Sequence, residues 1–248
     1  MLSIDRELLE LSCRDMLFAH WPVKAEALRP YVPHSLTIDT YDGSAWVGFV
    51  AFQVHSIKAA NTSIPMVAPF LNLNLRTFVR DGSQTGIYFL SSDVDSRAAT
   101  AIGHRLFGFA VYQARMHQRN RNGGIDFRSE RTGHEGRKMG LQVRYEPTGD
   151  VFQPEPGSVE KFLIERSRYY LGGEPDRTLS GSPSDSNNRS VRTGETEPSA
   201  HRLRSVDLDI RANTLLNDFE DGLLSDDPTA YYCERRDSGW NPLESAFG

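Results

Sequence analysis

The chain has 248 residues, of which 38% are hydrophobic and 25% charged, and its formal net charge is −5. This length fits one large domain with a full core, and the acidic balance lacks the basic footprint of a nucleic-acid-binding protein. No run approaches the roughly 18 consecutive apolar residues of a membrane-spanning helix. We therefore expect a single domain over residues 1–248 with no nucleic-acid partner and no membrane partner.

The first residues mix charges and lack the basic start and apolar core of a secretory signal, so we expect a cytoplasmic location. Two isolated cysteines, Cys13 and Cys233, do not make a disulfide framework or a zinc site. The histidines show no metal-binding spacing, and no nucleotide or dinucleotide motif occurs. The sequence therefore predicts neither a metal nor a cofactor.

The N-terminal elements are predicted from apolar periodicity and turn residues. A strand ends near Val23, and Pro22 suits the first turn of a short helix that Pro33 ends. Residues 41–43 read as a turn. The residues from Ala45 to Val54 are almost all apolar, which indicates a strand buried on both faces.

Residues 71–79 alternate strictly between apolar and mainly polar side chains. Leucines and Val79 fall on one face, whereas Asn72, Asn74, Arg76 and Phe78 fall on the other. Asp81-Gly82 predicts a hairpin turn, with the partner strand over 86–92.

Further elements follow in the second half of the chain. We expect a helix capped by Ser96 and ended by Gly108, strands over 109–117, 125–129, 141–146 and 230–234, and helices over 158–170 and 211–219. Residues 172–201 contain almost no apolar side chains, which predicts a polar, mobile insertion outside the core.

Residues 103–115 resemble the segment in which acetoacetate decarboxylases carry their Schiff-base lysine. Gly103, Gly108, Phe109 and Ala114 match that pattern. The nucleophile is absent, because Val111 stands at the position of the lysine, after Ala110 in place of a proline.

Most of the chain, from about 15 to 171, also resembles the YqjF-like family of uncharacterised proteins, domain of unknown function 2071. The matching motifs are at 17–23, 28–33, 42–48, 73–79 and 162–166. The resemblance implies an α+β fold of the acetoacetate decarboxylase-like type: a closed, mainly antiparallel β-barrel with a few flanking helices and an interior pocket.

The missing amine decides the mechanism that the resemblance implies. Without it no imine forms to accept the electrons of a departing carboxylate. The chain has only four lysines, and Lys58, near a polar loop, and Lys161, on a capped helix, are not obvious substitutes. We expect no Schiff-base decarboxylation.

Arg76, with Asn72 and Asn74 on its strand face, is the leading ligand-binding candidate, because an inward guanidinium needs an anionic partner. That partner is a ligand carboxylate or an internal Asp or Glu, unless the face points to water. If Val111 faces the cavity, Gln113 and Arg115 share its side.

Two further residues are candidates for the pocket. His20 suits general acid or base chemistry near neutral pH. The simpler interpretation is that this histidine packs within the fold. Tyr88 is a candidate for placing its hydroxyl group in the pocket, and the simpler interpretation is that its ring packs in the core.

These residues support two functional hypotheses. The first is a pocket that binds a small anionic metabolite, a carboxylate, without Schiff-base chemistry. The alternative is a lyase or isomerase that acts on a keto or hydroxy acid by general acid/base catalysis. A third hypothesis, an interaction module, would require a large exposed apolar patch. The sequence leaves open whether the protein is an enzyme and whether it forms a homo-oligomer.

Overall fold

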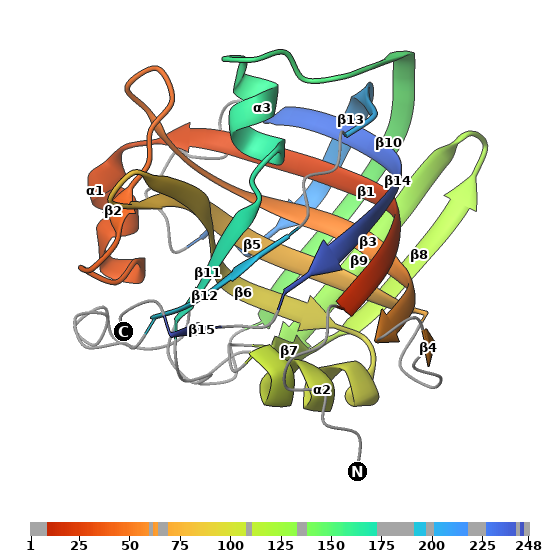
Figure 1. The fold of residues 1–248 in the computed structure, drawn as a ribbon. Coiled ribbons are helices and arrows are strands. Elements are labelled where there is room, and N and C mark those ends of the chain that lie inside the picture. Colours follow the sequence, from red (N-terminus) through yellow and green to blue (C-terminus); the bar gives the residue numbers. More distant parts are fainter. Residues whose placement is uncertain are drawn as a thin grey trace.

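The computed structural model describes residues 9–59, 62–63, 69–107, 111–132, 138–172, 191–196, 201–217, 227–241 and 244–245. These residues form one strongly curved sheet with three short α-helices and a single 3-10 turn at its margins (Figure 1). The strands are β1 (Leu9–Val23), β2 (Thr37–Ile38), β3 (Ala45–Ala59), β4 (Thr62–Ser63), β5 (Phe70–Asp81), β6 (Gln84–Val94), β7 (Val111–Gln113), β8 (Arg115–Arg121), β9 (Gly124–Thr132), β10 (Lys138–Phe152), β11 (Arg168–Gly172), β12 (Val191–Glu195), β13 (Leu203–Asn213), β14 (Thr229–Trp240) and β15 (Glu244–Ser245). The helices are α1 (Ala25–Leu28), η1 (Arg29–Tyr31), α2 (Arg97–Phe107) and α3 (Val159–Ile164).

The centre of the sheet is built from long strands whose sequences alternate or are apolar throughout. β3 pairs antiparallel with both β1 and β5, and β5 pairs antiparallel with β6. The β5–β6 hairpin turns at Gly82, whose φ of 57° is in the left-handed region that glycine tolerates. The predicted strands over 45–54, 71–79 and 86–92 and the turn at 81–82 are confirmed.

Each face of these central strands carries its own apolar core. The first core lies on the face of Leu71, Leu73 and Leu75 and also takes in Phe127 of β9 and Tyr145 of β10. The second core lies on the opposite face. It is formed by Phe18, Val50, Phe52, Phe70, Phe78, Ile87 and Phe89 with Leu163 of α3, Val111 of β7 and Tyr169 of β11.

The two ends of the sheet fold onto these two faces. On the first face, Arg131 of β9 forms a buried ion pair with Asp93 of β6, with 3.3 Å between Nε and Oδ1. Towards the second face, the residue after β12, Thr196, bridges Trp240 of β14, and Tyr169 of β11 packs against the Trp240 ring. The curvature therefore encloses both cores.

The closed barrel and the α+β class that the resemblance implied are wrong. Among the described residues the sheet is open: its hydrogen-bonded order runs from edge strand β15 to edge strand β8, and the helices are too few and short for an α+β fold. β8 exposes Arg115, His117 and Arg121, and charged side chains of this kind discourage further pairing at a sheet edge.

Several predicted elements also differ. Residues 109–117 form two strands that separate at Ala114, with 108–110 outside the described part. α3 stops at Ile164, because the chain turns into β11, which pairs with β6. Residues 211–213 continue β13 rather than starting a helix, because β13 pairs with β10. Pro22 lies in β1 rather than in the first turn of the short helix, which begins at Ala25 after Lys24, and Gly108 lies outside the described residues. The remaining expected elements, including Ser96 as the α2 cap and the strands at 125–129, 141–146 and 230–234, are confirmed.

The polar segment 172–201 is only partly described. Within it, Val191–Glu195 forms β12 against β11, and Val191 is buried in the first core. The prediction that the segment lies outside the core is therefore wrong for Val191, and Thr196 and His201 are buried as well, at 7% and 2% exposed. Residues 173–190 and 197–200 lie outside the described residues.

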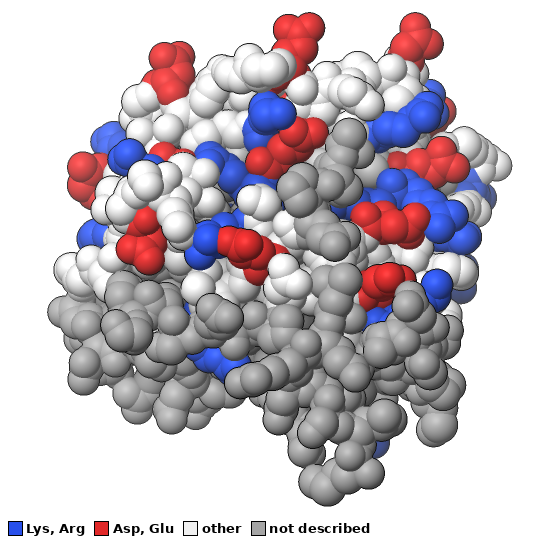
Figure 2. Space-filling model, viewed as in Figure 1, with Lys and Arg blue, Asp and Glu red and all other residues white. Residues whose placement is uncertain are grey.

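Two surface features bear on partners. In Figure 2, Lys and Arg side chains are interspersed with Asp and Glu on the described part of the face shown. In the part of the chain that the structure describes, the helices are too short or too polar to cross a membrane.

Candidate ligand-binding site

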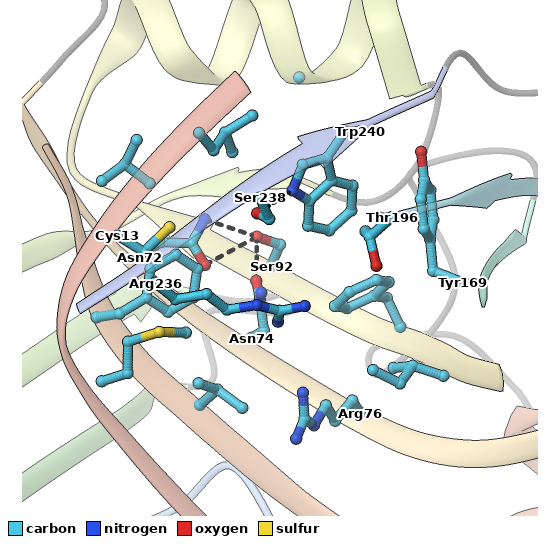
Figure 3. A pocket seen from close by; sticks show the side chains of 18 of the residues that line it. Cys13, Asn72, Asn74, Arg76, Ser92, Tyr169, Thr196, Arg236, Ser238 and Trp240 are labelled. Atoms are coloured by element: carbon cyan, nitrogen blue, oxygen red, sulfur yellow. Dashed lines mark hydrogen bonds between the residues drawn. The ribbon is translucent and has the colours of Figure 1, made fainter. Parts of the chain in front are cut away.

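A cavity of about 160 Å³ lies within the second core, between the central strands and the β11 and β14 strands that fold over them. Figure 3 shows Asn72, Asn74, Ser92 and Arg236 gathered in one space. Most of its lining is apolar. The described polar lining residues are Asn72, Asn74, Arg76, Ser92, Arg166, Arg168, Thr196, Arg236 and Ser238.

Arg76 is 5% exposed and reaches the cavity because β5 alternates its side chains between the two cores. Its Nε donates to His20 Nε2 at 3.2 Å, and its Nη2 donates to the Leu163 carbonyl at 2.7 Å, near the C-terminus of α3. It forms no ion pair with any described residue. Burial, together with the charges of Arg236 and Arg166, lowers the Arg76 pKa to about 9.

His20 is fully buried behind Arg76 and serves as its hydrogen-bond acceptor. Because Nε2 accepts, Nδ1 carries the proton, and Nδ1 has no hydrogen-bond partner among the described residues. Burial and the neighbouring Arg76 charge keep the His20 pKa well below its usual value. His20 is therefore neutral, and it positions the guanidinium rather than lining the cavity.

Two asparagines and a serine make a polar chain across the cavity floor. Asn72 Nδ2 donates to Ser92 Oγ at 3.2 Å, and Ser92 Oγ donates to Asn74 Oδ1 at 2.7 Å (Figure 3). Ser92 belongs to β6 and the asparagines to β5, so the chain joins two paired strands. These contacts hold the amide groups in fixed orientations beside Arg76.

Two more arginines contribute positive charge. Arg236 of β14 extends its side chain into the cavity (Figure 3), and burial lowers its pKa while the charge of Glu165 acts against that shift. Arg166 is neutralised by Asp39, with 3.0 Å between Nη2 and Oδ2, and stacks on the Phe162 ring. The described lining contains no Asp or Glu to balance Arg76.

A second buried histidine lies behind the cavity wall. His201 packs edge-on against the Phe18 ring, and its Nδ1 is 3.8 Å from Glu165 Oε1. Burial, followed by the charges of Arg236 and Arg76, lowers the His201 pKa to about 3, so these effects outweigh the attraction of Glu165. The neutral ring therefore adds no further positive charge beside the two arginines.

The structure brings only some of the sequence-predicted site residues to the cavity. Arg76, Asn72, Asn74 and Val111 line the cavity, and His20 lies directly behind it. Tyr88 points into the first core. Gln113 and Arg115 are exposed, because the chain changes partner at Ala114: β7 pairs with β6, whereas β8 pairs with β9.

Sequence reasoning missed Arg236, Ser92 and His201. Arg236 lies in a polar stretch, 235–238, beyond the strand predicted at 230–234, and only the pairing of β14 with β1 brings it to the cavity. The register shift between Leu75 and Arg76 gives β6 one extra residue, and this places Ser92 on the same face as Ile87 and Phe89. No sequence pattern indicates this shift.

All four lysines lie away from the cavity. Lys24, Lys58 and Lys138 are exposed, and Lys161 pairs with Glu165 at 2.8 Å on the outer side of α3. Val111 is 5% exposed and contacts the cavity at the position that the resemblance assigns to the nucleophile. Among the described residues, no group of His, Cys, Asp or Glu side chains is arranged to hold a metal ion.

Comparison with solved structures identifies the fold. Acetoacetate decarboxylase from Legionella pneumophila superposes with a TM-score of 0.63 at 9% identity, covering 96% of this chain and 86% of its own. The enduracididine biosynthesis enzyme MppR complexed with pyruvate gives 0.63 at 11% identity, covering 99% and 91%. The chain thus has an acetoacetate decarboxylase-like fold, and at these identities the likeness extends to the fold alone.

Sequence comparison gives the family. The uncharacterised protein YqjF of Bacillus subtilis (strain 168) is 29% identical over 230 residues, covering 92% of this chain and 88% of its own. Residues 10–237 match the model of a family described as an uncharacterised conserved protein. The chain belongs to this family, domain of unknown function 2071.

Proposed function

We propose that the protein binds a small anionic metabolite, a carboxylate, in the cavity of the second core, and that Arg76 is its principal anchor. One observation carries the proposal. Arg76 is a buried cation at a cavity wall, and none of the described residues pairs it with a carboxylate.

Burying the Arg76 charge carries an energetic cost. An arginine removed from water is expensive unless an anion and hydrogen bonds compensate for it. His20 and the Leu163 carbonyl supply two hydrogen bonds but no negative charge. A ligand carboxylate would supply that charge, and the guanidinium fork suits two parallel hydrogen bonds.

The lining residues support binding better than proton-transfer catalysis. The groups that face the cavity are arginines, amides and hydroxyls, which hold an acid in place. Of the other titratable lining groups, Cys13 has a pKa raised by burial to about 12, and burial also raises the pKa of Tyr169. A lyase or isomerase would need a general base near pH 7, and neither group meets that need.

A thermal-shift titration of wild type and Arg76→Met with small carboxylates tests the proposal. A ligand at ten times its Kd stabilises a protein by about 1.4 kcal/mol, or about 3–6 °C at this size. We expect that shift in wild type and its loss in Arg76→Met. Arg128→Met, at an exposed arginine paired with Glu130, is the matched control and should keep the shift. Equal shifts in wild type and Arg76→Met would refute the proposal.

A further inference from the structure

The polarity of the cavity changes steadily along β5, and this gradient indicates which acid fits. On the cavity face the strand carries Phe70, then Asn72 and Asn74, then Arg76. Six residues of strand span about 20 Å. The cationic end and the apolar end are therefore well separated along one wall.

The neighbouring elements repeat the same polarity. The Arg76 end lies beside His20 and the C-terminus of α3. The Phe70 end pairs with Val54 of β3 and lies towards α2, which contributes Ala99 (Figure 1). Val111 of β7 lies beside Ser92, at the level of Asn74, and packs against Gly103 of α2. A ligand with its carboxylate at Arg76 would extend an uncharged body towards α2.

Arg236 strengthens the cationic end although its backbone lies opposite Cys13 of β1, in register with the apolar end. Figure 3 shows its side chain extending from β14 into the cavity, and its charge lowers the pKa of Arg76 and of His201. The space between Cys13 and α2 is lined mainly by apolar side chains, among them Leu11, Ile57 and Val94, and Ser238 lies opposite Leu11.

We infer that the ligand is an amphipathic monocarboxylic acid that carries one aromatic ring or an alkyl chain of similar size. This inference rests on the proposed function and narrows it. The cavity measures about 160 Å³, close to the roughly 150 Å³ of an apolar protein cavity that accommodates benzene. A two- or three-carbon acid would leave the apolar end of this cavity unfilled.

Isothermal titration calorimetry with acetate, butyrate, hexanoate and phenylacetate, and with hexanol as the uncharged analogue, tests the inference. Each methylene buried at the apolar end lowers Kd by about fourfold. Hexanoate should therefore bind roughly two hundredfold more tightly than acetate, and hexanol should bind far more weakly than hexanoate.

Two variants locate the body of the ligand. Val111→Phe fills the side of the cavity next to α2, whose Gly103 packs against Val111, and should weaken hexanoate and phenylacetate at least tenfold while leaving acetate unchanged. Ala99→Leu, on α2, should act in the same direction and serves if Val111→Phe does not fold. The control is Val151→Phe, at a side chain that is 48% exposed on β10.

The outcomes separate the inference from the proposed function. If all acids bind equally whatever their length, or if Val111→Phe and Ala99→Leu have no effect on the longer acids, the inference is overturned and the carboxylate site stands. If no acid binds, if hexanol binds as tightly as hexanoate, or if Arg76→Met binds acids like wild type, the proposed function fails and the inference falls with it.

Discussion

The two faces of the central strands are built for different tasks. The first face, with Leu71, Leu73 and Leu75 of β5, is packed by apolar side chains from β9 and β10. The second face, with Asn74 and Arg76 of the same strand, contains a cavity and a buried cation. Under the proposed function, one strand would serve stability on one side and ligand binding on the other, because consecutive side chains point to opposite faces.

The largest expected difference is in stability. Leu73 is 2% exposed in the first core, and Leu73→Ala should lower the free energy of unfolding by about 2–5 kcal/mol, because it leaves a void among packed neighbours. Urea denaturation followed by tryptophan fluorescence measures this loss.

The matched change on the other face is Asn74→Leu. It removes the hydrogen bond that Asn74 accepts from Ser92 but buries apolar surface beside a cavity, so we expect a change within about 1 kcal/mol. Equal losses in the two variants would show that both faces are primarily structural.

The second face should also govern acid sensitivity. The His201 pKa is about 3 in the folded state and about 6.5 when unfolded, so between these values the unfolded chain binds one more proton. Stability therefore falls as pH decreases from 6.5 towards 3. His201→Gln should flatten the slope by about 1.4 kcal/mol per pH unit.

Unfolding midpoints at pH 4, 5, 6 and 7 measure that slope. Asp93, whose pKa burial raises to about 6, changes the slope in the opposite sense over about 4–6, but it lies in both proteins and cancels in the comparison. Parallel curves for wild type and His201→Gln would contradict the neutral, buried imidazole.

The smallest expected effect is in imine trapping, where we expect no covalent adduct. Treatment with acetoacetate or pyruvate and sodium borohydride should leave the mass of the protein unchanged, because Val111 occupies the cavity and all four lysines lie elsewhere. Intact mass spectrometry reads this directly. An adduct mapped to Lys58 or Lys161 would show that an amine reaches a reactive carbonyl after all.

Sequence reasoning succeeds where the pattern is local. The period of two along 71–79 is enough to predict that Arg76 and the leucines lie on opposite faces, and the motifs at 17–23 and 73–79 are enough to indicate the family. The amino-acid sequence alone therefore identifies Arg76 as a candidate, although its direction towards a cavity depends on how the sheet curves.

Sequence reasoning fails where long-range pairing decides. Gln113 and Arg115 follow Val111 in the alternation, yet the chain leaves β6 at Ala114 and both side chains turn to solvent. Arg236 reaches the cavity only through the register of β14 with β1. The expected closure of the sheet came from resemblance, whereas the described strands end at two separate edges, β15 and β8.

The most direct test of the central claim is a crystal structure of the protein with 4-bromophenylacetate, in which anomalous scattering locates the bromine. We predict the carboxylate within about 3 Å of the Arg76 guanidinium, and the bromine near Val111 on the α2 side of the cavity. A ligand bound elsewhere, or one bound with its carboxylate towards α2, would contradict the account.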